Sequence, residues 1–145
     1  MLRIIARERE VTLSSAVQNG AVVMATEDDL HQVLYNLIEN GIKYSGSGGF
    51  VHTNVVNDGE TVVITVEDNG IGIPEEDKLH IFDRFYRVDK MRSRAIGGTG
   101  LGLSIVKDTV HYRGGTISVS DRENGVGTKF TVILPSAKEQ GGAWE

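Results

Sequence analysis

Apolar residues along the chain recur with two spacings, every second residue in some segments and every third or fourth in others. The first spacing, or a short β-branched run, predicts strands at residues 10–17, 21–25, 50–56, 61–67, 116–120 and 128–134. The second predicts helices at residues 28–44 and 100–112, and a short helix that begins at Pro74 and carries Leu79. Strands and helices interspersed in this way indicate an α+β fold in which helices cover a sheet.

Glycine-containing turns predict how the strands pair. An Asn-Gly turn at residues 18–20 predicts a hairpin between the strands at 10–17 and 21–25. A similar turn at residues 57–59 predicts a hairpin between the strands at 50–56 and 61–67, and one at residues 123–125 predicts a hairpin between those at 116–120 and 128–134. Three hairpins are therefore expected.

The composition is that of an ordinary globular domain and excludes several kinds of site. The chain has 145 residues, 39% of them hydrophobic and 24% charged, enough for one domain with a hydrophobic core. It has no cysteine, which excludes disulfides, a zinc–thiolate site and a cysteine nucleophile. A net charge of −5 without long basic runs argues against nucleic-acid binding. No apolar stretch reaches the roughly 20 residues of a membrane span, and the charged start does not resemble a signal peptide.

The predicted helix at 28–44 carries two stripes of side chains. Thr26 is the expected N-cap. One stripe is apolar and is expected to pack on the sheet; it consists of Leu30, Val33, Leu34, Leu37 and Ile38. The neighbouring stripe holds two amides, an ammonium and a phenol, namely Asn36, Asn40, Lys43 and Tyr44. Glu39 points away from most of this second stripe, and we expect no role for it in a site.

The polar stripe combines groups that suit a metal-bound nucleotide. Asparagine oxygens can coordinate Mg²⁺, which keeps waters and phosphate oxygens as its other ligands. A lysine one turn further on can neutralise phosphate charge, and a tyrosine can line a base or sugar. The same stripe also fits a solvated helix flank, and by itself it leaves both interpretations open.

A glycine-punctuated loop at residues 68–74 follows the β-branched strand at 61–67. Its first residue, Asp68, is expected to project its carboxylate into the loop rather than the sheet, where it can accept a hydrogen bond from an amine such as that of adenine. Gly70 and Gly72 would let the backbone lie flat against a purine. Asp-Asn-Gly is also a common turn sequence, so this motif alone does not decide between a turn and a site.

A second glycine loop, at residues 98–103, opens the helix at 100–112. A helix N-terminus with exposed amides is an anion site. The spacing Gly-x-Gly-x-Gly without a preceding strand differs from a dinucleotide-binding fingerprint, and no Gly-Lys-Ser/Thr tripeptide indicates a P-loop. Residues 87–98 predict a mobile loop, with Arg87 at its entrance as a phosphate clamp.

Four motifs in order resemble those of one known family. Residues 36–45, 68–74, 81–87 and 98–103 resemble the N, G1, F and G2 boxes of the catalytic ATP-binding domain of bacterial sensor histidine kinases. Residues 127–130 resemble the last glycine box of that family. The resemblance implies the Bergerat ATP-binding fold, an α+β two-layer sandwich with a mixed sheet of about five strands and three helices on one face.

The resemblance implies ATP and Mg²⁺ as ligands. Asn40 would hold Mg²⁺ with help from Asn36, and Lys43 and Arg87 would meet the phosphates, so Asn36, Lys43 and Arg87 are the expected catalytic residues. Asp68 would accept a hydrogen bond from the adenine amino group. The further expected ATP contacts are Tyr44, Gly70, Gly72, Ile73, Gly98, Thr99, Gly100, Leu101, Gly102, Leu103 and Thr128.

The superfamily also contains ATPases, in which a glutamate four residues before the metal-binding asparagine activates water. This chain has Asn36 at that position. Because an amide cannot act as a general base, water attack should be poor and transfer to an imidazole favoured. An ATPase, or an ATP-binding regulatory module without transfer, remains the alternative.

The histidine that accepts phosphate in such kinases is expected in another part of the protein. The chain's histidines lack the sequence context of the dimerising helical hairpin that carries it; they are His31, His52, His80 and His111. Residues 1–9 are therefore expected to be a linker remnant from that hairpin, residues 10–136 the catalytic domain and residues 137–145 a loose tail. The expected partners are the hairpin and, downstream, a response regulator. The fragment is expected to be a cytoplasmic monomer whose parent protein can be membrane-anchored.

Overall fold

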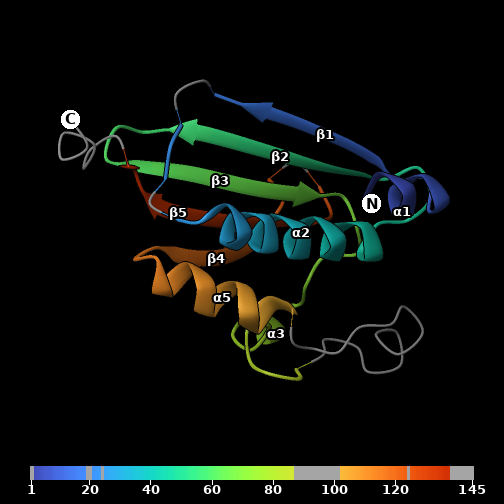
Figure 1. The fold of residues 1–145 in the computed structure, drawn as a ribbon. Helices are drawn as coiled ribbons and strands as arrows, with labels where there is room; N and C mark the ends of the chain where they lie inside the picture. The colour runs from blue at the N-terminus through green and yellow to red at the C-terminus, as the bar shows by residue number, and fades with distance from the viewer. Residues whose placement is uncertain (1, 19–20, 24, 87–101, 124, 138–145) are drawn as a thin grey trace.

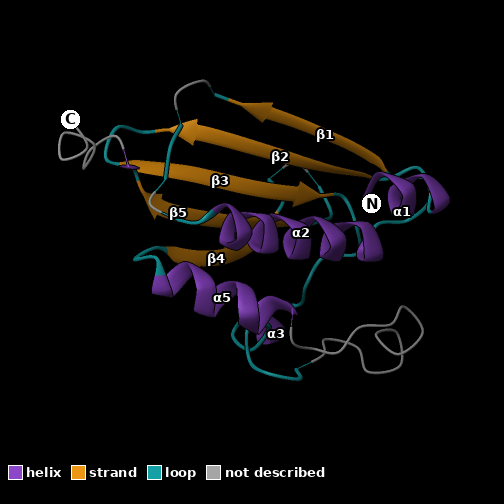
Figure 2. Cartoon of the chain, viewed as in Figure 1, coloured by secondary structure: helices purple, strands orange, loops and turns teal. Residues whose placement is uncertain are grey.

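The fold is built on a five-stranded mixed sheet. The computed structural model describes residues 2–18, 21–23, 25–86, 102–123 and 125–137 (Figure 2). In the order of the sheet, the strands are β1 (Thr12–Val17), β2 (Phe50–Asn57), β3 (Thr61–Asp68), β5 (Thr128–Pro135) and β4 (Thr116–Asp121). β1 is parallel to β2, and the other neighbouring pairs are antiparallel. The predicted α+β fold with a mixed sheet is confirmed.

The larger helices cover one face of this sheet. The described helices are α1 (Leu2–Glu8), α2 (Glu27–Tyr44), α3 (Glu75–Lys78) and α5 (Gly102–Tyr112). Figure 1 shows α2 and α5 side by side over the sheet. They run antiparallel, because the Arg113 guanidinium just after α5 lies 2.6 Å from the Asp29 carboxylate in the first turn of α2. Among the helices that the structure describes, none has the length and apolar character to cross a bilayer.

The core lies between the sheet and these two helices. Side chains on β3 and β5 alternate between the two faces, as the sequence pattern predicts. The inward apolar residues of these strands are at most 4% exposed; they are Val62, Ile64, Val66, Phe130, Val132 and Leu134. They meet the buried helix residues Val33, Leu37, Val106 and Val110. The predicted apolar stripe of α2 is confirmed, since its remaining members pack against the same core.

The first predicted hairpin is wrong. β1 pairs with β2 in parallel, with Thr12 opposite Phe50, while residues 21–25 contribute only an isolated bridge from Val23 to Ser136 among the described residues. Alternating side chains predict that a segment is extended, but main-chain hydrogen bonds do not depend on which side chains flank them. The pattern therefore does not select the pairing partner.

The N-terminal segment is a helix that contributes to the core. Residues 1–9 were expected to be a linker remnant, but α1 places Ala6 at 3% exposure and packs Leu2 and Ile5 against the core. These three apolar residues lie at i, i+3 and i+4, which is one helical stripe. A stripe of a single turn is inconspicuous among the charged residues around it.

The C-terminal end of the domain extends one residue further than expected. Ser136 and Ala137 are both buried, and the Ala137 N–H donates to the Val22 carbonyl at 2.7 Å. The expectation of a loose tail is thus wrong for Ala137. Residues 138–145 lie outside the described residues.

Two helix boundaries also differ from the sequence predictions. α3 ends at Lys78, so Leu79 lies after the helix and is 82% exposed. The described part of the last helix begins at Gly102, and residues 100–101 lie outside it.

Thr26→Ala is expected to lower the free energy of unfolding by about 1 kcal/mol. Thr26 caps α2, with its Oγ1 accepting a hydrogen bond from the Asp29 N–H at 3.1 Å. Alanine would leave this N–H without its protein partner. Urea denaturation measures the change, and Thr26→Ser, which keeps the hydroxyl, should stay close to the wild type. Equal losses for both variants would contradict a role for the cap.

Candidate functional site

A buried carboxylate lies at the end of the central strand. Asp68 is the last residue of β3, 3% exposed, opposite Val51 on β2 and Thr128 on β5. It alternates in phase with the inward-facing residues of β3, so it lies on the helix-covered side of the sheet. Its Oδ1 accepts a hydrogen bond from the Gly70 N–H at 2.8 Å.

Burial dominates the electrostatics of Asp68. Removal from water raises the pKa of its carboxyl from the usual 3.8 to about 6, while hydrogen bonds from the Gly70 and Thr128 main chain oppose this rise. A carboxylate held in this way retains acceptor capacity for a donor from a ligand.

Main chain packs against main chain around this carboxylate, and glycines make that possible. A Cβ on Gly70 would lie 2.2 Å from the Tyr44 carbonyl oxygen, and one on Gly127 would lie 2.0 Å from the Asp68 carbonyl oxygen. Gly72 has a φ of +79°, which favours glycine. The end of α2, the loop after β3 and the turn before β5 therefore meet at Asp68.

The polar stripe of α2 meets the beginning of α5. The Asn36 side-chain oxygen lies 3.6 Å from the position that a Cβ on Gly102 would take. Gly102 is the first described residue of α5. The amide oxygen of Asn36 and the described start of α5 are thus brought together from two of the predicted motifs.

Lys43 has a partner that the sequence did not predict. Asn40, Lys43 and Tyr44 are half-buried on α2, and Lys43 Nζ lies 3.7 Å from Glu39 Oε1. Glu39 was expected to point away from most of the stripe, and Lys43 is the exception, because residues four apart on a helix lie only about 40° apart around its axis.

The remaining predicted site residues divide into two groups. Ile73 and Leu103 are partly buried and pack against the core, and Thr128 is buried beside Asp68. The others lie outside the described residues; they are Arg87, Gly98, Thr99, Gly100 and Leu101.

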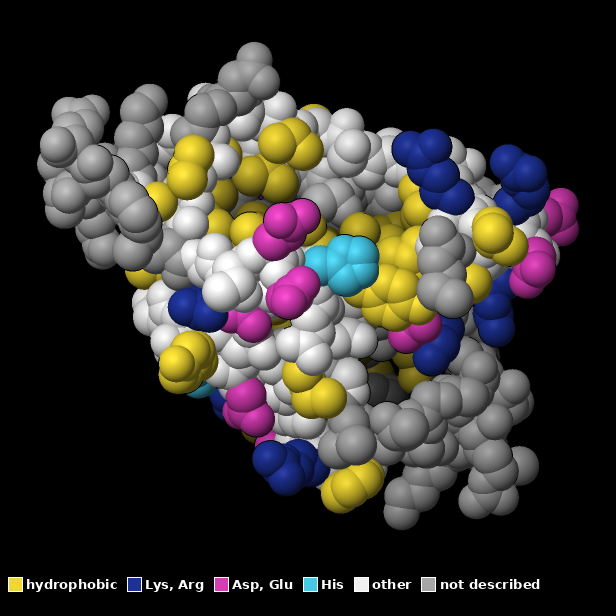
Figure 3. Space-filling view, in the orientation of Figure 1, with side chains coloured by type: hydrophobic (Ala, Val, Ile, Leu, Met, Phe, Trp, Pro, Cys, Tyr) yellow, Lys and Arg dark blue, Asp and Glu magenta, His cyan; other side chains and the backbone are white. Residues whose placement is uncertain are grey.

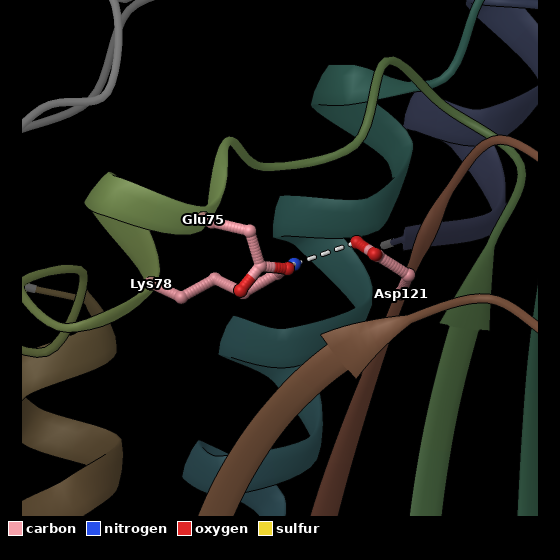
Figure 4. A network of polar contacts seen from close by, with 3 residues as sticks. All are labelled: Glu75, Lys78 and Asp121. Atoms are coloured by element: carbon pink, nitrogen blue, oxygen red, sulfur yellow. Dashed lines mark hydrogen bonds and ion pairs between the residues drawn. The ribbon is translucent and has the colours of Figure 1, made fainter.

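Ion pairs anchor the segment between the two glycine loops. Figure 4 shows Lys78 on α3 lying between Glu75 and Asp121, the last residue of β4, whose Oδ1 is 2.7 Å from Lys78 Nζ. Further along, the Tyr86 hydroxyl donates to the Asp77 carboxylate. Lys78 and Asp121 are 43 positions apart, so their contact left no local signal in the sequence.

The side chains over the helix face are of mixed charge. Figure 3 shows basic and acidic side chains scattered across this face, with hydrophobic ones between them. Among the described residues, no group of three or more His, Cys, Asp or Glu side chains could hold a metal ion.

A known family matches most of the chain. Residues 25–138 match the family described as histidine kinase-, DNA gyrase B- and HSP90-like ATPase. The chain belongs to this family. The sensor histidine kinase WalK of Bacillus subtilis is 49% identical over 121 residues, which cover 82% of this chain and 20% of WalK. The chain thus spans about a fifth of that relative's length.

Solved structures of family members have the same fold. The mycobacterial sensor histidine kinase MprB superposes with a TM-score of 0.79 at 29% identity, covering 93% of this chain and 90% of that one. The catalytic domain of the histidine kinase ThkA gives a TM-score of 0.78 at 30% identity, covering 93% of this chain and 86% of that one. ThkA has also been solved in complex with the response regulator protein TrrA. The resemblance noted from the four motifs is thereby confirmed.

The sequence analysis missed the contacts that three residues make around the candidate site. Gly127 was part of a recognised motif but was given no role, although its Gly-Thr context before a strand was a usable signal. Asn69 ties the first glycine loop to β2, since its Oδ1 accepts a hydrogen bond from the Phe50 N–H at 2.8 Å. Glu39 was set aside from its helical angle alone.

Proposed function

We propose that this chain binds Mg-ATP and transfers the γ-phosphoryl group to a histidine on a separate dimerisation domain, as the catalytic domain of a two-component sensor histidine kinase. The observation that supports this proposal is the position of Asn36 beside the first residue of α5. An amide there can bind a metal or stabilise phosphate, but it cannot take a proton from water. Transfer to a supplied imidazole is therefore favoured over hydrolysis.

The base would be selected at Asp68. Its carboxylate has one oxygen bound by the Gly70 N–H, and the group can accept a further hydrogen bond from the adenine amino group. Gly70 and Gly72 keep side chains away from the approach to it, and Ile73 adds apolar surface. Thr128 lies beside Asp68 in the sheet and would support the same contact through water.

The phosphates and the metal would lie along α2 toward α5. Asn36 and Asn40 offer neutral oxygens, a set that suits Mg²⁺ because this ion keeps several waters and binds substrate phosphates. When bound, Mg²⁺ would neutralise charge on the phosphates. Lys43 would contact the same phosphates, and so would Arg87 and residues 98–103, which lie outside the described residues.

The proposed reaction needs no general base on this chain. A neutral imidazole nitrogen forms a bond to the γ-phosphorus while the bond from phosphorus to the β–γ bridging oxygen breaks, so that ADP leaves. The ring proton passes to solvent. The chain's own residues hold the nucleotide in line with the acceptor. A response regulator, the class of protein found in the ThkA complex, is the proposed downstream partner.

Mixing this chain with a separately produced hairpin domain and γ-labelled ATP tests the proposal. Acid-labile label on the hairpin histidine is expected, and Asn40→Ala should abolish it. Asn54→Ala, an amide on β2 away from the polar stripe, is the matched control and should retain labelling. Bound ATP without label would favour a regulatory module, and steady phosphate release from the chain alone would favour an ATPase.

A further inference from the structure

Three side chains form a row on α2 beside the proposed phosphate contacts. Tyr35, Glu39 and Lys43 follow one another at intervals of four residues, so they lie on one ridge of the helix. Glu39 Oε1 is 3.7 Å from Lys43 Nζ. The Tyr35 hydroxyl donates a hydrogen bond to the same carboxylate.

This row is more restrained than an ordinary surface ion pair. The side chains of Lys43 and Glu39 are only 25% and 27% exposed. Two long, exposed side chains gain little from pairing, because they must give up rotamer freedom. Here Tyr35 also bonds to the Glu39 carboxylate, which restricts the rotamers open to that side chain.

We propose that Glu39 is a positioning residue that holds the Lys43 ammonium when no nucleotide is bound, so that nucleotide phosphate must compete with the Glu39 carboxylate for this cation. The inference rests on the proposed function, because it takes Lys43 as a phosphate contact. Its consequence is that the chain binds the phosphate part of a nucleotide less tightly than its lysine alone would allow.

The geometry sets the size of the effect. A phosphate oxygen bonded to Lys43 Nζ at about 2.8 Å would lie no more than about 6.5 Å from Glu39 Oε1, given the 3.7 Å between carboxylate and ammonium. The repulsion of two unit charges at this distance in a water-like medium corresponds to about a threefold change in affinity. The base and sugar carry no such charge, so their binding should not respond.

The test compares ligands with and without phosphate on matched variants. Calorimetry or NMR titration gives the affinities of wild type, Glu39→Gln and Glu27→Gln for Mg-ATP, Mg-ADP and adenosine. Glu27 is an exposed residue in the first turn of α2, about 24 Å from Lys43 along the helix, and its variant removes the same charge. Glu39→Gln should bind Mg-ATP and Mg-ADP about threefold more tightly and adenosine unchanged, and Glu27→Gln should match the wild type for all three.

Each other outcome has a definite meaning. Weaker or unchanged Mg-ATP binding by Glu39→Gln would overturn the inference, and so would an equal change for adenosine, which indicates a general structural effect. In a Lys43→Met background no ammonium holds the phosphate within 6.5 Å of the Glu39 carboxylate, so the gain from Glu39→Gln should shrink; a full gain there would also overturn the inference. Absence of Mg-ATP binding by the wild type would instead contradict the proposed function itself.

Discussion

Asp68→Asn is expected to stabilise the fold at neutral pH while weakening ATP binding. The buried carboxyl has a pKa of about 6 against 3.8 in an unperturbed setting, a difference that corresponds to about 3 kcal/mol. An amide removes the cost of burying a charge, so the free energy of unfolding at pH 8 should rise by up to that amount. Loss of a charged acceptor for the adenine amino group should lower ATP affinity by about 10- to 100-fold.

The pH dependence of the stability shows whether the buried charge of Asp68 causes the gain. Because the pKa is raised in the folded state, the stability contributed by this group is fully present below about pH 3.8 and is lost as the pH rises through about 6. The advantage of Asp68→Asn over wild type should therefore be absent near pH 3.8, grow toward pH 6 and stay constant above it. Urea denaturation at several pH values measures this difference.

A matched control separates this effect from a general change in charge. Asp108 is exposed on α5, and Asp108→Asn should show neither the pH-dependent gain nor the loss of ATP binding. A pH-independent difference between Asp68→Asn and the wild type would contradict the raised pKa. Unchanged ATP affinity would contradict base recognition at Asp68.

Gly127→Ala is expected to destabilise the domain by about 3 kcal/mol or more. Gly127 has a φ of +145°, which strains any residue with a Cβ, and that Cβ would lie 2.0 Å from the Asp68 carbonyl oxygen. The contact is with main chain at the end of β3, so no side-chain rotation can relieve it. Thermal or urea denaturation measures the loss, and ATP binding should fall with it because Asp68 must shift.

Gly125 offers a closely matched comparison. Its φ of +142° is nearly that of Gly127, but a Cβ there would meet chiefly the end of the Arg122 side chain, which can rotate away. Gly125→Ala therefore carries the backbone strain without the collision. If both variants lost the same stability, the close approach to Asp68 would not be the reason for glycine at position 127.

Elements defined by their own residues could be predicted from the sequence. α2 was predicted to within a residue because its cap, its acidic first turn and its apolar stripe all lie within the helix itself. The β2–β3 and β4–β5 hairpins followed from tight turns between adjacent strands. Each of these signals is local.

Features that depend on distant segments could not be predicted in this way. The parallel pairing of β1 with β2 joins segments separated by all of α2, and nothing in residues 12–17 specifies it. In the site, the four motifs identified the candidate residues. The burial of Asp68 could not be predicted, because it depends on the end of α2, the loop after β3 and the turn before β5 meeting in space. The Glu39–Lys43 contact was local but was missed, because rotamers rather than helical angle alone decide where two long side chains meet.

The parallel β1–β2 pair limits where the N-terminus of this domain can be truncated. The family match begins at residue 25, but β1 and the buried residues Ala6 and Val11 come before it. A fragment trimmed to that boundary would leave β2 with an open row of unpaired main-chain groups, next to apolar surface that these two residues had covered. Such an edge can pair with another copy of itself. The N-terminal segment thus completes the sheet with β1 and, through Ala6 and Val11, covers apolar surface beside it.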